Sequence, residues 1–281
     1  MATMTPGEFD ARPAELVDRA RADHDAGLYR DALETARELL GFLDAIGELA
    51  PIGEHALPRV AACAIGARCL SELGDPPGAL ELIDEGRAST DASDVESRLE
   101  LDAAAGQVLA RSGRVEAAIA LLESAFAACR DLGSDAARAA SLEALASAYA
   151  AGGRYDVAIA RAEEAIACAE RAGTDQARSL TTLARAYLGA GNLDRAEAEY
   201  ERALELARQR EARGTEGWVL LAGGEIAARR GDRARAEQRL DDAQEIAEEL
   251  SMMPLVERCR ATLRRALQAE RTSESSRRSE S

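Results

Sequence analysis

The sequence predicts an all-α protein built as an array of helix pairs. At six regularly spaced places a glycine is followed five residues later by an alanine. The glycines recur at steps of 47, 39, 40, 38 and 40 residues, and a second small residue stands seven positions before each of them. Such a period is typical of helical solenoids, in which each unit packs on its neighbours. The pairs are Gly27/Ala32, Gly74/Ala79, Gly113/Ala118, Gly153/Ala158, Gly191/Ala196 and Gly231/Ala236.

The clearest unit lies at residues 177–212. Its first predicted helix carries apolar residues at the spacing i, i+3, i+4 and i+7, which places them on one face. Gly191 and Asn192 then end this helix, because both residue types readily adopt the left-handed backbone of a helix terminus. A second amphipathic helix is predicted from Leu193. The apolar face of the first helix consists of Leu180, Leu183, Ala184 and Tyr187, and the preceding unit repeats it at Leu142, Leu145, Ala146 and Tyr149.

Capping residues predict where several helices begin. Ser134 and Thr174 each follow a glycine and precede an aspartate. This order suits a hydroxyl N-cap with an acidic residue in the first turn. Ser93 and Glu96 have the spacing of a capping box. Pro76 begins the second helix of its pair, where proline is tolerated in the first turn.

One run of residues resembles the tetratricopeptide repeat: Leu183-Ala184-x-x-Tyr187-x-x-x-Gly191-x-x-x-x-Ala196-x-x-x-Tyr200-x-x-Ala203. The resemblance implies a right-handed superhelical solenoid of about six helix–turn–helix repeats with a concave inner face. The typical unit has about 34 residues, and the units here are longer by roughly five or six. In this they are similar to the repeat regions of bacterial signalling regulators and of some scaffold proteins.

The sequence predicts one solenoid over residues 13–270, with a capping helix at 254–270. Residues 1–12 are expected to be flexible. The tail 271–281 contains no apolar residue, which predicts disorder. A long connection at residues 47–58, with two prolines and two glycines, is expected to be a looser joint between the first two units.

Composition excludes several classes of partner and reaction. The formal net charge is −16, and the chain lacks the basic stripe that duplex nucleic acid or an anionic membrane requires. All 35 basic residues are arginine, which excludes Schiff-base and P-loop lysine chemistry. The N-terminus lacks the pattern of a secretory signal, and no apolar run is long enough for a membrane span. We therefore expect a cytoplasmic protein with five reduced, buried cysteines.

The residues predict no catalytic centre. The two histidines, His24 and His55, have no second histidine or cysteine at the spacing of a metal site. No strand is predicted that would precede a dinucleotide-binding glycine motif. We therefore expect neither an enzyme, a metal site nor a cofactor.

The register of the repeats predicts which residues face the concave groove. If the superhelix forms, positions six, ten and thirteen residues before each turn glycine point inwards. Arginines at such positions either bind a ligand carboxylate or phosphate or pair with acidic residues of neighbouring helices. Trp218 is either an exposed anchor for a ligand or a packing residue between two repeats. The groove candidates are Arg21, Arg68, Gln107, Arg178, Arg185, Trp218 and Glu225.

Two known ways in which such repeats bind peptides do not fit these residues. One uses a ladder of groove asparagines, whereas this chain has a single asparagine, Asn192, in a turn. The other clamps a C-terminal carboxylate with paired lysine and asparagine, and the chain has no lysine.

The sequence therefore favours a non-enzymatic scaffold or adaptor that binds a protein or peptide in its groove. The alternative is a regulatory sensor that binds a peptide or small effector and controls a separate transcription or signalling partner. A third interpretation is a structural protein that self-associates through a terminal repeat.

Overall fold

A computed structural model describes residues 6–47, 56–91, 94–129 and 134–279. This part of the chain contains thirteen α-helices and no β-strand, which confirms the all-α prediction. The helices are α1 (Pro6–Ala26), α2 (Tyr29–Gly47), α3 (Ala56–Leu73), α4 (Pro76–Ala88), α5 (Val95–Arg111), α6 (Val115–Cys129), α7 (Asp135–Ala151), α8 (Tyr155–Ala172), α9 (Ala177–Gly189), α10 (Leu193–Gln209), α11 (Arg213–Arg230), α12 (Arg233–Glu249) and α13 (Met253–Ser279).

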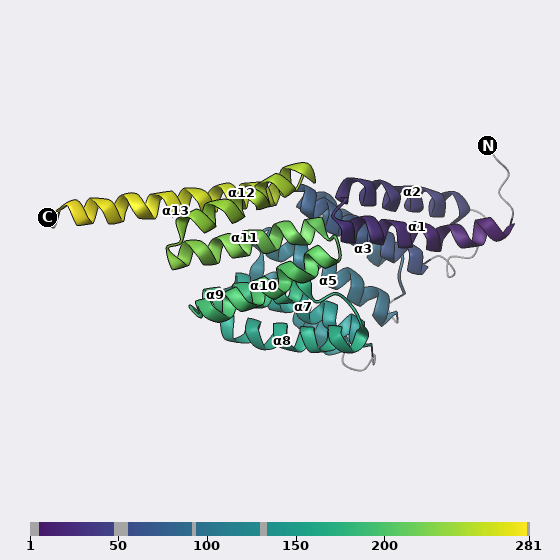
Figure 1. Cartoon of the computed structure of the whole chain (residues 1–281). Helices are drawn as coiled ribbons and strands as arrows, with labels where there is room; N and C mark the ends of the chain where they lie inside the picture. The colour runs from purple at the N-terminus through teal and green to yellow at the C-terminus, as the bar shows by residue number, and fades with distance from the viewer. Residues whose placement is uncertain (1–5, 48–55, 92–93, 130–133, 280–281) are drawn as a thin grey trace.

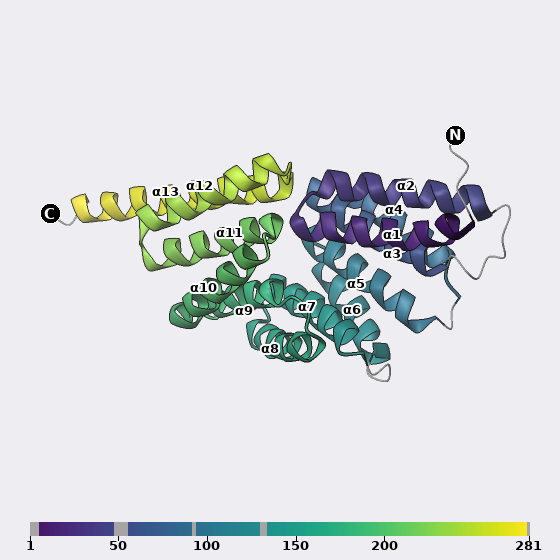
Figure 2. The same cartoon turned by 45° about the vertical axis from the view of Figure 1, so that its right-hand side comes forward.

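Consecutive helices pack as antiparallel pairs that stack into a curved array (Figures 1 and 2). Each odd-numbered helix also contacts the next odd-numbered helix, from α1 through to α13. Within the described residues, the even-numbered helices make no such contacts with one another. The odd-numbered helices therefore form the inner layer of the curve and the even-numbered helices the outer one, as in other helical solenoids.

The six predicted turn glycines all have a left-handed backbone. Their φ angles lie between 72° and 90°, a region that glycine adopts without the steric cost of a β-carbon. At Gly191 the turn is closed by two backbone bonds, from Gly191 N–H to Leu188 C=O (3.1 Å) and from Asn192 N–H to Tyr187 C=O (2.9 Å). This is the pairing expected when a glycine ends a helix.

Small residues let the two helices of each pair approach closely. The six alanines that follow the turn glycines are at most 1% exposed. Where glycine stands seven positions before the turn, a leucine of the partner helix fills the space instead. A β-carbon on Gly106 would come within 2.4 Å of the Leu122 side chain, and one on Gly224 within 2.5 Å of Leu240. The periodic small residues are thus the contact points of the paired helices.

The two ends of the array meet. α1 contacts α11, and α3 contacts α13. A β-carbon on Gly27 would lie only 2.6 Å from the backbone nitrogen of Gly214. A single hydrophobic cluster contains Leu39 and Ile65 from the first repeats together with Ile246 and Leu255 from the last. This apolar contact joins the two ends of the array across its concave side.

The first and last helices extend beyond the predicted ends of the solenoid. α1 begins at Pro6, within the segment 1–12 that the sequence predicts to be flexible. α13 continues to Ser279, into the segment 271–281 for which the sequence predicts disorder. A helix that is already nucleated by packing extends at little cost, and arginine and glutamate favour the helical backbone. Residues 1–5, 280–281 and most of the predicted joint, at 48–55, lie outside the described residues.

The predicted N-caps are confirmed in one case and wrong in another. Ser134 accepts a hydrogen bond from the Ala137 N–H at 3.3 Å, as predicted. α9 begins after Gln176 rather than Thr174, and the Asp175 carboxylate accepts the bond from Ala177 N–H at 3.1 Å. At α5 the cap is Asp94, while Ser93 lies outside the described residues. Asparagine and aspartate cap helices as well as serine does, so neighbouring residues compete for this role.

Among the described residues, no helix combines the length and the apolar character that crossing a bilayer requires.

Enlarging the alanines at the helix contacts should destabilise the array. Ala158 and Ala196 are fully buried, so replacement of either by leucine should lower the free energy of unfolding by about 1–3 kcal/mol through overpacking. Ala198→Leu is the matched control, because Ala198 is exposed on the same helix as Ala196. Thermal denaturation followed by circular dichroism measures the effect. Equal stability of Ala196→Leu and Ala198→Leu would contradict this packing.

Candidate functional site

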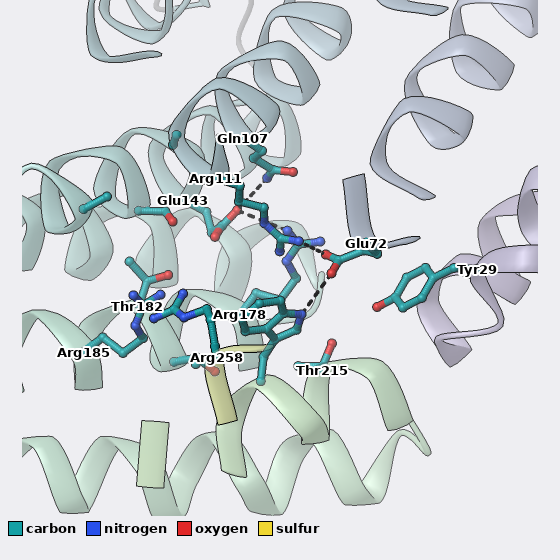
Figure 3. A pocket seen from close by; sticks show the side chains of 15 residues that line it. Tyr29, Glu72, Gln107, Arg111, Glu143, Arg178, Thr182, Arg185, Thr215 and Arg258 are labelled. Carbon is teal, nitrogen blue, oxygen red and sulfur yellow. Dashed lines mark hydrogen bonds and ion pairs between the residues drawn. The ribbon is translucent and has the colours of Figure 1, made fainter. Parts of the chain in front are cut away.

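The inner layer of helices lines a groove with three adjoining hollows. The central hollow has a volume of about 180 Å³ and receives side chains from every odd-numbered helix from α3 to α13 (Figure 3). Tyr29, at the start of α2, completes its wall. Among the residues that line it are Glu72, Gln107, Arg111, Glu143, Ser147, Arg178, Thr181, Thr182, Arg185, Thr215, Trp218 and Arg258.

The other two hollows continue the central one in opposite directions. The N-terminal hollow, about 340 Å³, is lined by α1, α3, α5, α7 and α9 and shares Gln107, Glu143 and Arg178 with the central hollow. The C-terminal hollow, about 370 Å³, is lined mainly by α9, α11 and α13 and shares Arg185 and Arg258 with it. Because neighbouring hollows have lining residues in common, they form one continuous groove along the inner layer.

The positions six residues before the turn glycines all line this groove, in agreement with the predicted register. They are Arg21, Arg68, Gln107, Ser147, Arg185 and Glu225. A second row, two residues before each glycine, lines it as well: Asp25, Glu72, Arg111, Ala151, Gly189 and Arg229. Sequence reasoning missed the second row, although residues four positions apart share a helix face and the periodicity contained the signal.

The structure places all seven predicted groove residues on the groove wall, but not at one point. Arg21 and Arg68 lie in the N-terminal hollow and Glu225 in the C-terminal hollow. Trp218 lies in the central hollow. The remaining three lie where hollows join: Gln107, Arg178 and Arg185. That these residues bind a ligand stays a prediction.

Three of the four predicted groove arginines face acidic partners. Arg21 and Arg68 lie 4.0 and 3.8 Å from the Glu100 carboxylate. Arg178 lies 3.9 Å from Glu143. These distances correspond to the internal pairing that the sequence left as an alternative.

Arg185 is different from the other three. Within the described part of the chain it has no hydrogen-bonding or ion-pair partner, although its side chain lines both the central and the C-terminal hollow. Its planar fork of donors is therefore directed to the groove (Figure 3).

A polar contact closes the central hollow where the two ends of the array meet. The Trp218 indole N–H donates to the Glu72 carboxylate at 3.1 Å, and Arg111 forms an ion pair with the same carboxylate at 2.5 Å (Figure 3). The guanidinium groups of Arg111 and Arg258 lie 4.8 and 5.6 Å from the centre of the Trp218 ring. Trp218 therefore joins α11 to α3 across the groove.

The charges around Glu72 keep it ionised although it is buried. Burial by itself would raise the pKa of the Glu72 carboxyl group. The positive charges of Arg111 and Arg178, with the hydrogen bonds from Arg111 and Trp218, outweigh this effect and lower the pKa. The carboxylate is thus a stable acceptor in the closing contact at neutral pH.

Arg258 is a further groove residue that sequence reasoning missed. It lies on α13, outside the six glycine-marked pairs, so the repeat register could not assign it. Burial, followed by repulsion from Arg185 and Arg111, lowers its pKa to about 10, although Glu225 at 3.6 Å partly offsets this. Only contact between distant helices brings it into the groove.

Among the described residues, no group of three or more histidine, cysteine, aspartate or glutamate side chains is arranged to bind a metal ion. The predicted absence of a metal and of a cofactor stays a prediction.

Sequence comparison identifies the repeats. Residues 98–171 and 177–210 match models described as tetratricopeptide repeat. No curated protein sequence matches the chain. The second matched segment lies within the unit at residues 177–212.

Solved structures of low sequence identity share the fold. A Rap protein complexed with competence and sporulation factor has a TM-score of 0.64 and 15% identity, covering 92% of this chain and 76% of the Rap chain. Aspartyl phosphate phosphatase F from Bacillus subtilis has a TM-score of 0.53 and 10% identity, with coverages of 96% and 84%. BtubC (BKLC) from P. vanneervenii has a TM-score of 0.51 and 18% identity, with coverages of 82% and 92%. At such identities the likeness shows the fold alone.

The closing contact makes a prediction about acid stability. Since the folded pKa of Glu72 is below its ordinary value of 4.5, its contribution to stability is present above that value and is lost as the pH falls through the folded pKa. Glu72→Gln removes the charge, which should lower the free energy of unfolding at pH 7 by about 1.5–3 kcal/mol. The variant should lose less stability than the wild type as the pH falls below 4.5.

Thermal denaturation and Trp218 emission measure both effects. Glu116→Gln is the control, because Glu116 forms an exposed ion pair with Arg154 away from the groove. If Glu72→Gln melted like this control at pH 7, the closing contact would not stabilise the array.

Proposed function

Because residues 98–171 and 177–210 match tetratricopeptide repeat models, we propose that this chain is a non-enzymatic interaction module that binds a peptide segment of a protein partner along its inner groove. The observation that carries the proposal is the continuity of the three hollows, which share residues at both junctions. A continuous groove suits an extended chain better than a compact small molecule, whose sites are usually single pockets.

The polar lining suits the backbone of a peptide. The hydroxyl groups of Ser147, Thr182 and Thr215 offer both donors and acceptors along the central hollow, and the Gln107 amide, which donates one N–H to Glu143, keeps its oxygen as an acceptor. An extended peptide presents an N–H and a C=O at each residue, and these groups need such partners when they leave water. The groove therefore offers backbone recognition without the asparagine ladder that the chain lacks.

The fold comparison supports the same proposal at a coarse level. One similar structure is a Rap protein in complex with competence and sporulation factor. That complex concerns the Rap protein itself. For this chain we take from it only that an array of this shape accommodates a bound factor.

We infer a cytoplasmic module whose partner is neither a nucleic acid nor a membrane. The net charge of −16 opposes both polyanionic surfaces, and four described cysteines are free and buried, as expected in a reducing compartment. Self-association through a terminal repeat is less favoured, because the first and last repeats bury apolar residues against each other.

The closing contact favours a regulatory sensor as the second candidate function. Trp218, Glu72 and Arg111 join the two ends and also line the central hollow. A ligand in this hollow therefore touches the residues that hold the array closed, and its binding free energy can shift the closure. Small-angle scattering with and without ligand tests this: the radius of gyration should change on binding for a sensor and stay constant for a passive adaptor.

Peptide selection with a groove-filling variant tests the main proposal. Peptides are selected from a random dodecapeptide display library on the wild-type protein, synthesised, and measured by fluorescence anisotropy. Ser147 lines the central hollow and is partly exposed, so Ser147→Trp should obstruct the groove and weaken binding by about tenfold or more.

Ala198→Trp is the matched control, since it adds the same side chain on the outer layer. Circular dichroism checks that both variants fold. The proposal fails if the selection enriches no peptide, or if both tryptophan variants bind the selected peptides equally well.

A further inference from the structure

Charge is distributed unevenly along the groove. In the N-terminal hollow, three arginines (Arg21, Arg68, Arg178) face three acidic residues (Asp25, Glu143, Asp175). In the C-terminal hollow, the described side chains include four arginines (Arg185, Arg229, Arg258, Arg265) and a single acidic residue, Glu225. A protein with a net charge of −16 thus has a locally positive hollow at one end of its groove.

The four arginines of the C-terminal hollow are incompletely paired. Within the described residues, Arg185 and Arg229 have no hydrogen-bonding or ion-pair partner. Arg265 bonds only to neutral groups of its own helix, the Ala261 carbonyl at 3.4 Å and the Thr262 hydroxyl at 3.1 Å. Arg258 shares Glu225 at 3.6 Å.

The arrangement leaves a positive potential that a bound anion would neutralise. The neighbouring charge of Arg185, together with burial, already makes the charged form of Arg258 less favourable than usual. Arginine binds carboxylates through two parallel N–H···O bonds, which are about twice as strong as bonds between neutral groups. An oxyanion in this hollow would therefore gain bonds and relieve repulsion at the same time.

We propose that the C-terminal hollow binds carboxylates at the acidic end of the peptide, so that the bound peptide lies with this end against α13. This proposal rests on the proposed function and adds the chemistry and the direction of the ligand. The paired charges of the N-terminal hollow give no comparable preference, and they lie at the opposite end of the same groove.

The acidity of the whole protein does not prevent this binding. At physiological ionic strength the Debye length is about 8 Å, so the charges of the outer surface act weakly on a group inside the hollow. The same outer charge disfavours a long polyanion such as nucleic acid, most of which would lie outside the hollow on an acidic surface. A short acidic segment avoids this cost.

Four synthetic peptides test the proposal and identify the source of the carboxylate. They are N-acetylated tetraglutamate and N-acetylated tetraglutamine, each with a free or an amidated C-terminus. Binding is measured by the fluorescence of Trp218, which is the only tryptophan of the chain and lies beside Arg258 in the central hollow.

We expect tetraglutamate with a free C-terminus to bind at least about tenfold more tightly than amidated tetraglutamine. Tight binding of amidated tetraglutamate assigns the hollow to side-chain carboxylates, and tight binding of free tetraglutamine assigns it to the terminal carboxylate. Either result supports the proposal. Equal affinities of all four peptides, or no binding of any, overturn it.

Two double variants locate the site. Arg185→Gln/Arg229→Gln removes the two unpaired arginines of the hollow and should weaken tetraglutamate binding by about tenfold or more. Arg202→Gln/Arg235→Gln removes the same charge from the outer helices α10 and α12, where both arginines are exposed and face acidic neighbours, and should leave the affinity unchanged. Equal affinities of the two variants would overturn the proposal.

The experiments distinguish a failure of the carboxylate proposal from a failure of the proposed function. If library-selected peptides bind the wild type and not Ser147→Trp, yet are neutral and insensitive to the loss of Arg185 and Arg229, the groove binds peptides and the direction proposed here is wrong. If no library peptide binds, the proposed function itself fails.

Discussion

The close approach of helices at small residues determines the geometry of the whole array. Alanine after each turn glycine, and alanine or glycine before it, allow the backbones of each pair to approach closely. Where one partner is reduced to glycine, as at Gly106, a leucine from the other helix fills the space. The resulting pairs are alike, and they stack through contacts between successive odd-numbered helices into a curved array.

The curvature brings together residues that lie far apart in the sequence, which no single repeat can do. The array curves until its first and last repeats meet, and the Trp218 indole then reaches Glu72, 146 positions away in the sequence. This contact bridges the groove at its centre. The charges that hold this closure, on Glu72 and Arg111, are also part of the groove wall, so the integrity of the fold and the chemistry of the groove depend on the same residues.

Much of the fold could be predicted from the sequence, because the regular spacing of equivalent residues shows where each helix pair begins and ends. Gly191 ends a helix through its backbone freedom, and Ala196 packs because of its size; both are local properties, repeated six times. The same register located groove positions such as Arg185. The second row of the groove, which includes Glu72 and Arg111, follows from helix periodicity and was predictable in principle. The length of α13 was not, because residues 271–279 lack an apolar pattern and extend a helix that is packed elsewhere.

By itself, the sequence determined that this protein is an all-α array of helix pairs, with glycine turns and an inner row of polar residues. Those features depend on interactions within one repeat or between neighbours. Only the tertiary structure decided that the ends close, that Trp218 joins them, and that Arg258 stands beside Arg185 while Arg178 faces Glu143. These contacts depend on the small rotations between successive repeats, which add up over the whole array. The sequence pattern of a single repeat does not show how large the total rotation is.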